Sequence, residues 1–270
     1  WACQAGLDAP VIRGLAEKCG EEDIDFAAKK AAWGCHADVL DLLASEFGAR
    51  IGMGCMNQAA GWGHDAMIDH LVEKYRVDPN GVDGNGYTAL HCATMRVRTV
   101  KHLVEKHNVD IHKRKGDGQT ALDFAEWIGE TESAAYLCEL TYTQLLAGEY
   151  RGDVDVKLLC SAASRGHDAM IDLLVERYGV DPNGAGSRGR TALHWATEYG
   201  LHWVAYRGRV RTVKHLVEKH KVDIHKRDSL GDTALDQAEE NGRTECAAYL
   251  REVTYTQLLA GEYRGDIDVK

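Results

Sequence analysis

"GRTALHWATEYG", at residues 189–200, contains a short motif that returns at three other places in the chain. A second Thr-Ala-Leu-His lies at residues 88–91, and Thr-Ala-Leu-Asp lies at residues 120–123 and 233–236. The first two of these motifs in the chain start 32 residues apart. Four near-copies of one motif indicate repeated units, and a period in this range is typical of stacked repeat proteins.

Longer stretches are also duplicated, so a block of several units has been copied as a whole. Residues 63–81 recur at 166–184, residues 97–114 at 210–227, and residues 141–157 at 254–270. We therefore predict one tandem array over residues 1–270, made of divergent N-terminal units (1–52), a first block (53–157) and its duplicate (158–270). Another unit follows residue 157, whereas the sequence stops at residue 270, so we expect a piece of a longer array.

Each unit has the pattern of two helices. A Thr precedes each short Ala-rich segment, at a position where its hydroxyl can cap free backbone N–H groups; these residues are Thr88, Thr120, Thr191 and Thr233. In the Asp copies an acidic residue follows three positions later, near the positive end of the helix. The next segment has apolar side chains three and four residues apart, as at Ile171, Leu174 and Val175. Neither helix can bury its apolar face alone, so we predict that the units stack.

This combination of a unit of about 33 residues, Thr-x-Leu-His-x-Ala, Gly-His and an amphipathic helix resembles the ankyrin repeat. "TALHCAT" and "TALHWAT" match closely, and residues 55–64 and 158–167 keep the Ala-Ala and Gly-His parts. The resemblance implies an all-α ankyrin-repeat solenoid of about eight helix-turn-helix units with short β-turn fingers. It also implies that His91 and His194 hydrogen-bond to turn backbone and thereby order the stack.

The sequence contains no motif that predicts catalysis or a cofactor. It has no phosphate-binding loop with Lys-Ser/Thr, no Gly-x-Gly-x-x-Gly that opens a helix after a strand, and no Gly-x-Ser-x-Gly. The formal net charge of −10 disfavours a dedicated nucleic-acid binder, and the short basic runs are interpreted as solvated edges. No apolar run approaches the roughly 18 residues of a membrane helix. We predict no enzyme, no cofactor, no nucleic-acid partner and no membrane insertion.

Eight cysteines without a Cys-x-x-Cys pair, most of them among apolar neighbours, are typical of reduced thiols in an intracellular protein. We therefore expect a cytoplasmic protein. An organelle stays an alternative, because the sequence begins at Trp1 rather than at Met and a targeting segment can be missing from it.

Thirteen histidines raise the question of a metal site. Two sets have members five residues apart: His102, His107 and His112, and His215, His220 and His225. Side chains that share a helix face lie three or four residues apart, so this spacing is not expected to bring the imidazoles together. We predict no metal site and interpret these residues as solvated, His-rich helix ends.

The family resemblance places partner binding on the concave surface formed by the first helices and the finger tips. Transferred position by position, it predicts the following partner-binding residues: Trp62, Cys92, Phe124, Trp127, Ile128, Ser164, Arg165, Trp195 and Tyr199. Trp203 joins them from an insertion at residues 201–208, which either covers a distorted stack or contacts a partner. Trp and Tyr are favoured anchors at interfaces, but packing between adjacent first helices is the alternative for Trp62 and Trp195.

From these features we predict a non-enzymatic protein–protein interaction scaffold. A rigid platform of repeats binds a partner with little ordering cost. Such a scaffold would recruit a client or form a structural subunit of a large multi-subunit complex. The alternative is the regulatory ankyrin part of a longer enzyme or channel, whose catalytic or membrane domain lies outside this sequence.

Overall fold

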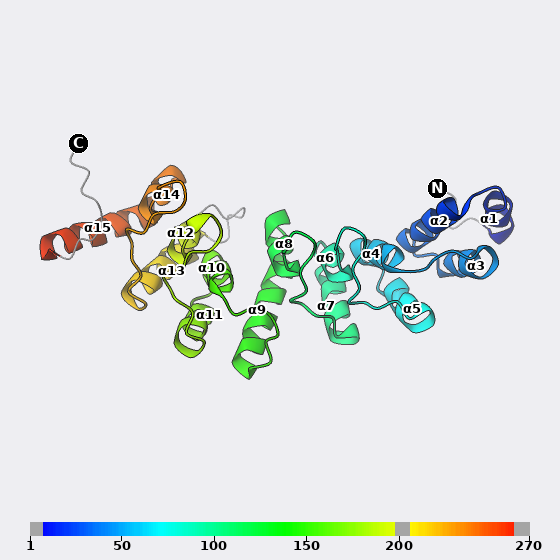
Figure 1. The fold of residues 1–270 in the computed structure, drawn as a ribbon, viewed down its shortest axis with the longest axis horizontal. Coiled ribbons are helices and arrows are strands. Elements are labelled where there is room, and N and C mark those ends of the chain that lie inside the picture. The colour runs from blue at the N-terminus through cyan, green and yellow to red at the C-terminus, as the bar shows by residue number, and fades with distance from the viewer. Residues whose placement is uncertain (1–7, 198–205, 262–270) are drawn as a thin grey trace. The chain divides into compact units, whose positions relative to one another are not determined.

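The protein folds into two compact units, Trp1–Gln144 and Leu145–Lys270, in a computed structural model that describes residues 8–197 and 206–261. Within these residues the chain forms helices, turns and loops and no strand, which confirms the predicted all-α class. Each unit is a series of helix pairs (Figure 1).

The first unit contains α1 (Ala9–Ala16) followed by four helix pairs. The pairs are α2 (Glu21–Trp33) with α3 (Ala37–Phe47), α4 (Met53–Trp62) with α5 (Asp65–Tyr75), α6 (Ala89–Ala93) with α7 (Val97–His107), and α8 (Ala121–Ile128) with α9 (Thr131–Ala147). The boundary between the units falls within α9, after Gln144. Contacts join α2 to α4, α4 to α6 and α6 to α8, so the first helices form one row (Figure 1). The second helices therefore lie on the other side of that row.

The second unit repeats this plan with three helix pairs. They are α10 (Val156–Arg165) with α11 (Asp168–Asp172), α12 (Ala192–Thr197) with α13 (Tyr206–Glu218), and α14 (Ala234–Glu240) with α15 (Thr244–Ala260). A π-helical turn, η1 (Leu173–Arg177), continues α11, and a 3₁₀ turn, η2 (Ser187–Gly189), precedes α12. The described residues thus contain α1 and seven helix pairs, in agreement with about eight predicted units.

The threonines predicted to cap the first helices form the expected hydrogen bonds at Thr120 and Thr233. Thr120 Oγ1 accepts a hydrogen bond from the Asp123 N–H at 3.2 Å, and Asp123 Oδ2 accepts one from the Thr120 N–H at 2.9 Å. Thr233 and Asp236 form the same reciprocal cap. Because each cap satisfies donors that the helix leaves free, the helix starts are fixed by local sequence.

Small residues allow the first helices to approach each other closely. Ala59 and Ala60 on α4 are fully buried, as are Ala162 and Ala163 on α10. The second helices supply many of the larger apolar side chains of the core, among them Leu40, Leu43, Ile68, Leu71, Val100 and Leu103 in the first unit and Ile171, Leu174, Val213 and Leu216 in the second. The first helices add Met56, Leu90, Leu159 and Leu193. The apolar seam therefore runs between the two rows of helices within each unit.

His91 joins one repeat to the next, as the family resemblance implied. Thr88 Oγ1 lies 2.7 Å from His91 Nδ1, and His91 Nε2 lies 3.0 Å from the carbonyl oxygen of Gln119 in the following finger. The hydroxyl donates to Nδ1, so Nε2–H donates to the carbonyl. His194 forms the same bridge from Thr191 to the carbonyl of Asp232, at 2.8 and 3.1 Å.

Because His91 and His194 are buried, we expect the folded protein to lose stability at low pH. Burial lowers the pKa of His91 and of His194, although the hydrogen bonds to carbonyls act in the opposite direction. Below a pH of about 6.5 the unfolded chain therefore binds protons that the folded chain does not, so acidification favours unfolding. We expect the free energy of unfolding to fall by up to about 1.4 kcal/mol per pH unit for each histidine.

Urea denaturation at a series of pH values measures this slope. In His91→Gln, which removes one of the two titrating bridges, the slope between pH 6.5 and the acid limit should be shallower. An unchanged slope in that variant would show that other groups produce the acid sensitivity.

The fingers between helix pairs are tight turns, as expected. The Asp83 N–H donates to the Tyr87 carbonyl at 3.0 Å, and the Lys115 N–H donates to the Gln119 carbonyl at 2.9 Å. These hydrogen bonds define short β-turn fingers without forming strands in this part of the chain.

The single array over residues 1–270 stays a prediction. The boundary between the compact units follows Gln144, whereas the duplicated blocks meet at residue 157. No helix within the described residues is both long enough and apolar enough to span a membrane.

Candidate functional site

A stripe of exposed apolar side chains marks the first helices of the first unit. It consists of Phe26 on α2, Trp62 at the end of α4, Met95 after α6, and Trp127 on α8, with the partly buried Trp33 of α2 beside Trp62. The exposed fractions are 58% for Phe26, 50% for Trp62, 59% for Met95 and 66% for Trp127. Large apolar side chains gathered in this way, rather than scattered singly, indicate an interaction surface.

Neighbouring members of this apolar stripe are held in place by one another. The Trp33 and Trp62 rings meet edge to face, with centroids 5.2 Å apart. Lys30 Nζ lies 4.4 Å from the Trp33 ring centroid and 5.2 Å from that of Phe26, so a cation covers both rings. Such contacts restrict the aromatic side chains before any partner arrives, and this lowers the entropic cost of binding.

A groove opens beside Trp62 and Met95. It has a volume of about 490 Å³, and residues 129–133, which comprise the turn after α8 and the start of α9, form its other wall. Arg96 and Arg98 lie on the Trp62 side, whereas Glu130 and Glu132 lie on the opposite wall. The groove therefore offers apolar surface between charged edges of both signs, as the core and rim of protein interfaces do.

Comparisons with known proteins identify the repeats. A family model described as ankyrin repeats (3 copies) matches residues 56–146, and one described as ankyrin repeats (many copies) matches residues 159–200 and 201–251. Together they match well over half of the chain. The chain belongs to the ankyrin repeat family. Ankyrin repeats are a protein-binding module, typically without catalytic activity.

Two solved structures resemble this ankyrin protein. One is the complex of the predatory endopeptidase Bd0816 of Bdellovibrio bacteriovorus with the immunity protein Bd3460; the match has 26% identity, a TM-score of 0.52, and covers 73% of this chain and 96% of that one. The other is the ankyrin repeat domain of Bcl-3, a member of the IkappaB protein family, with 21% identity, a TM-score of 0.50, and coverage of 84% and 97%. The second match shows the fold alone. A comparison with curated proteins found no match.

The ankyrin positions predicted for partner binding differ in exposure within the first unit. Trp62 and Trp127 are exposed, whereas Cys92, Phe124 and Ile128 are partly buried. Phe124 packs against Tyr87, with ring centroids 5.8 Å apart, and burial raises the pKa of the Cys92 thiol to about 12. Trp62 and Trp127 are therefore the members of this set that a partner reaches most easily.

The predicted residues of the second unit are less exposed. Ser164 donates its hydroxyl to the Ser161 carbonyl at 2.8 Å, and Arg165 is partly buried. Trp195 is partly buried, and its indole N–H has no acceptor within the described part of the chain. Tyr199 and Trp203, with residues 201–205 of the insertion, lie outside the described residues.

The two duplicated ankyrin blocks differ where the apolar stripe lies. Arg165, Gln237 and Glu240 occupy the positions that correspond to Trp62, Phe124 and Trp127 in the first block. The apolar stripe is thus a property of the first unit, because the second block lacks its aromatic residues at these positions.

Sequence reasoning did not find Phe26, Trp33 and Met95. Phe26 and Trp33 belong to the N-terminal units, in which the ankyrin pattern is weakest. Met95 follows α6, which at 5 residues is shorter than the other first helices of this unit. Register with the following repeats would have placed Trp33 and Trp62 at equivalent positions, because each ends a first helix.

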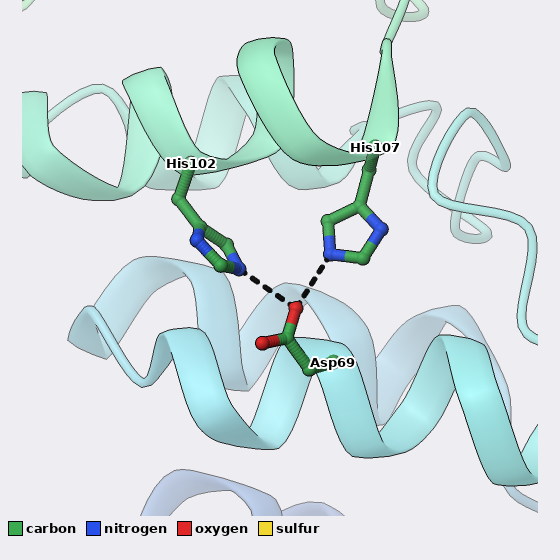
Figure 2. Close-up of side chains that lie close together, drawn as sticks. All are labelled: Asp69, His102 and His107. Atoms are coloured by element: carbon green, nitrogen blue, oxygen red, sulfur yellow. Dashed lines mark hydrogen bonds and ion pairs between the residues drawn. The ribbon is translucent and has the colours of Figure 1, made fainter.

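The expectation that the histidines spaced by five remain apart is wrong for two of each set. His102 Nε2 and His107 Nε2 each lie 2.8 Å from Oδ1 of Asp69 (Figure 2). His107 is the last residue of α7, and Asn108 follows in the left-handed conformation. The imidazoles converge because both reach toward one residue on the neighbouring helix α5, which the single-helix argument ignored.

Proposed function

We propose that this ankyrin protein is a non-enzymatic scaffold that binds a protein partner through the apolar stripe of its first unit. The partner inserts apolar side chains beside Trp62 and Trp127, and the groove next to Trp62 receives one of them. The observation that carries this proposal is the exposure of Phe26, Trp62, Met95 and Trp127 at successive first helices.

Energetic considerations support the choice of these residues. Tryptophan is enriched among the few interface residues that contribute most of the binding free energy. The stripe is preordered by the Trp33–Trp62 contact, so little conformational freedom is lost on binding. The similarity to a structure that contains an endopeptidase and an immunity protein agrees with recognition of a protein, without naming the partner of this chain.

Residues from the second block provide the test. We expect Trp62→Arg combined with Trp127→Glu, which copies Arg165 and Glu240, to weaken partner capture by about 30-fold or more, because roughly 2 kcal/mol is lost at an aromatic hot spot. Capture from extracts of the source organism, quantified by mass spectrometry, measures the change. The unfolding temperature should stay the same, because the chain already accepts these residues at equivalent positions.

Tyr255→Ala supplies the matched control. Tyr255 on α15 is an exposed aromatic residue of the second unit and should not affect capture. Equal losses in the control and the double variant would mean that capture depends on exposed aromatic side chains in general. Capture unaffected by the double variant would exclude the apolar stripe as the binding site.

A further inference from the structure

Asp69 on α5 receives two imidazoles and one ammonium group from α7. Its Oδ1 lies 2.8 Å from Nε2 of His102 and 2.8 Å from Nε2 of His107 (Figure 2). Lys106 Nζ lies 2.7 Å from Oδ2. The His107 side chain is 7% exposed and that of Asp69 23%. Two nitrogens and one carboxylate oxygen thus lie within 4.8 Å of one another, and Lys106 occupies the other oxygen.

The second unit contains the same arrangement. Nε2 of His215 and of His220 lie 2.7 and 2.8 Å from Oδ1 of Asp172, and Lys219 Nζ lies 2.7 Å from Oδ2. The ring centroids of the two histidines are 5.3 Å apart in both clusters. The aromatic residues of the first helices differ between the two blocks, whereas the aspartate, the two histidines and the lysine of this cluster occur in both.

A third cluster, around Asp41, has a tyrosine in place of the second histidine. It shows that the packing of adjacent second helices requires a hydrogen-bond donor at this position but not an imidazole. There Oδ1 lies 2.7 Å from His70 Nε2 and 2.6 Å from the Tyr75 hydroxyl, and Lys74 Nζ lies 2.6 Å from Oδ2. Tyr75 takes the place of the second histidine and donates the same hydrogen bond. A hydrogen-bond donor at this position therefore satisfies the packing of adjacent second helices, and the second imidazole adds a nitrogen ligand to that role.

The donor set has a clear preference among metal ions. Two imidazole nitrogens and one carboxylate oxygen suit Zn²⁺ and related transition-metal dications, whereas Mg²⁺ and Ca²⁺ prefer oxygen ligands. Around a tetrahedral ion with bonds of about 2.0–2.1 Å, the ligand atoms lie about 3.3 Å apart. Each imidazole nitrogen therefore needs to move away from the carboxylate oxygen by about 0.5 Å. Lys106 at the second carboxylate oxygen is the kind of outer partner that orients a ligating carboxylate.

We propose that Asp69, His102 and His107 bind one zinc-class dication, and that Asp172, His215 and His220 bind a second. Each ion joins the second helix of one repeat to that of the next, α5 to α7 and α11 to the end of α13. Water completes the coordination. Because the ligands converge only in the folded chain, the ion stabilises the stack.

Hydrogen bonds from the surrounding side chains lower the pKa of both cluster carboxylates. Partial burial raises the pKa of Asp69, but hydrogen bonds from Lys106, His102 and His107 outweigh it, so that the pKa falls to about 2. The pKa of Asp172 is lowered by the corresponding groups against the same effect of burial.

Titration of the 270-residue chain with ZnCl₂ in a calorimeter tests the proposal. We expect two ions for each chain, one for His107→Tyr, one for His220→Tyr and none for the double variant. Tyrosine should keep the hydrogen bond, as Tyr75 does, so the metal-free unfolding temperature of these variants should be unchanged. ZnCl₂ should raise the unfolding temperature of the wild type and have no effect on that of the double variant.

A gain of binding completes the design. Tyr75→His introduces the missing nitrogen beside Asp41 and His70, and we expect a third ion for each chain. Absence of zinc binding by the wild type would overturn the proposal. The same number of ions in the wild type and in the double variant would also overturn it, because zinc would then bind to other histidines or cysteines.

Discussion

His91→Ala is expected to lower the free energy of unfolding by about 3 kcal/mol, which combines unpaired buried groups with a cavity. His91 is fully buried and bridges Thr88 in its own repeat to the Gln119 carbonyl in the next finger. Alanine removes both hydrogen bonds at once and leaves the carbonyl without its donor. The fingers therefore lose one of the links between successive repeats, and we expect the unfolding transition to become less cooperative.

Urea denaturation followed by circular dichroism measures this effect. His102→Ala in metal-free buffer is the control within the same repeat, because that side chain is 20% exposed and its loss should cost only about 1 kcal/mol. His194→Ala should repeat the large effect in the second unit, where the bridge runs from Thr191 to Asp232. A cost below about 1 kcal/mol for His91→Ala would show that the bridge does not stabilise the stack.

Gly86→Ala is expected to cost about 3 kcal/mol, from backbone strain and a clash between fingers. Gly86 has a φ of +80°, and a Cβ added there would lie 2.5 Å from the backbone nitrogen and 2.9 Å from the Cα of Gly116 in the next finger. Because the obstacle is backbone rather than a flexible side chain, the two fingers would have to separate. The hydrogen bond from His91 to the Gln119 carbonyl would weaken in consequence.

Gly118→Ala is the matched control for this prediction. Gly118 occupies the same place in the following finger and has a φ of +87°, but a Cβ there would meet no atom within 4 Å. Only the conformational cost of about 1 kcal/mol should remain. Chemical denaturation of both variants separates strain from close approach, and equal costs would contradict the inferred contact between fingers.

Local sequence was sufficient to predict the helices and where they begin. The Thr–Asp caps, the alanines and the three- and four-residue apolar spacing act within one helix or one pair, so the same rules apply wherever the pattern occurs. The bridges from His91 and His194 were reached through the family resemblance. The pattern was weaker in the N-terminal units, and this is why Phe26 and Trp33 were overlooked.

The candidate sites depend on distances between repeats. Trp62 was equally compatible with burial between helices or exposure, and only the packing of α4 beside α2 and α6 decided that half of its surface remains accessible. The spacing of His102 and His107 argued against a common site as long as one helix was considered. The position of Asp69 on the neighbouring helix reversed that conclusion.

The sequence by itself determined the repeating unit, its helix starts and its apolar faces, because these follow from hydrogen bonds and periodicities within about 33 residues. Only the tertiary structure decided which side chains of different repeats converge and which remain exposed. Stacking juxtaposes residues roughly one repeat apart, and their separation depends on how closely the helices approach. Helix approach is a collective result of packing, so no single motif encodes the stripe around Trp62 or the clusters around Asp69 and Asp172.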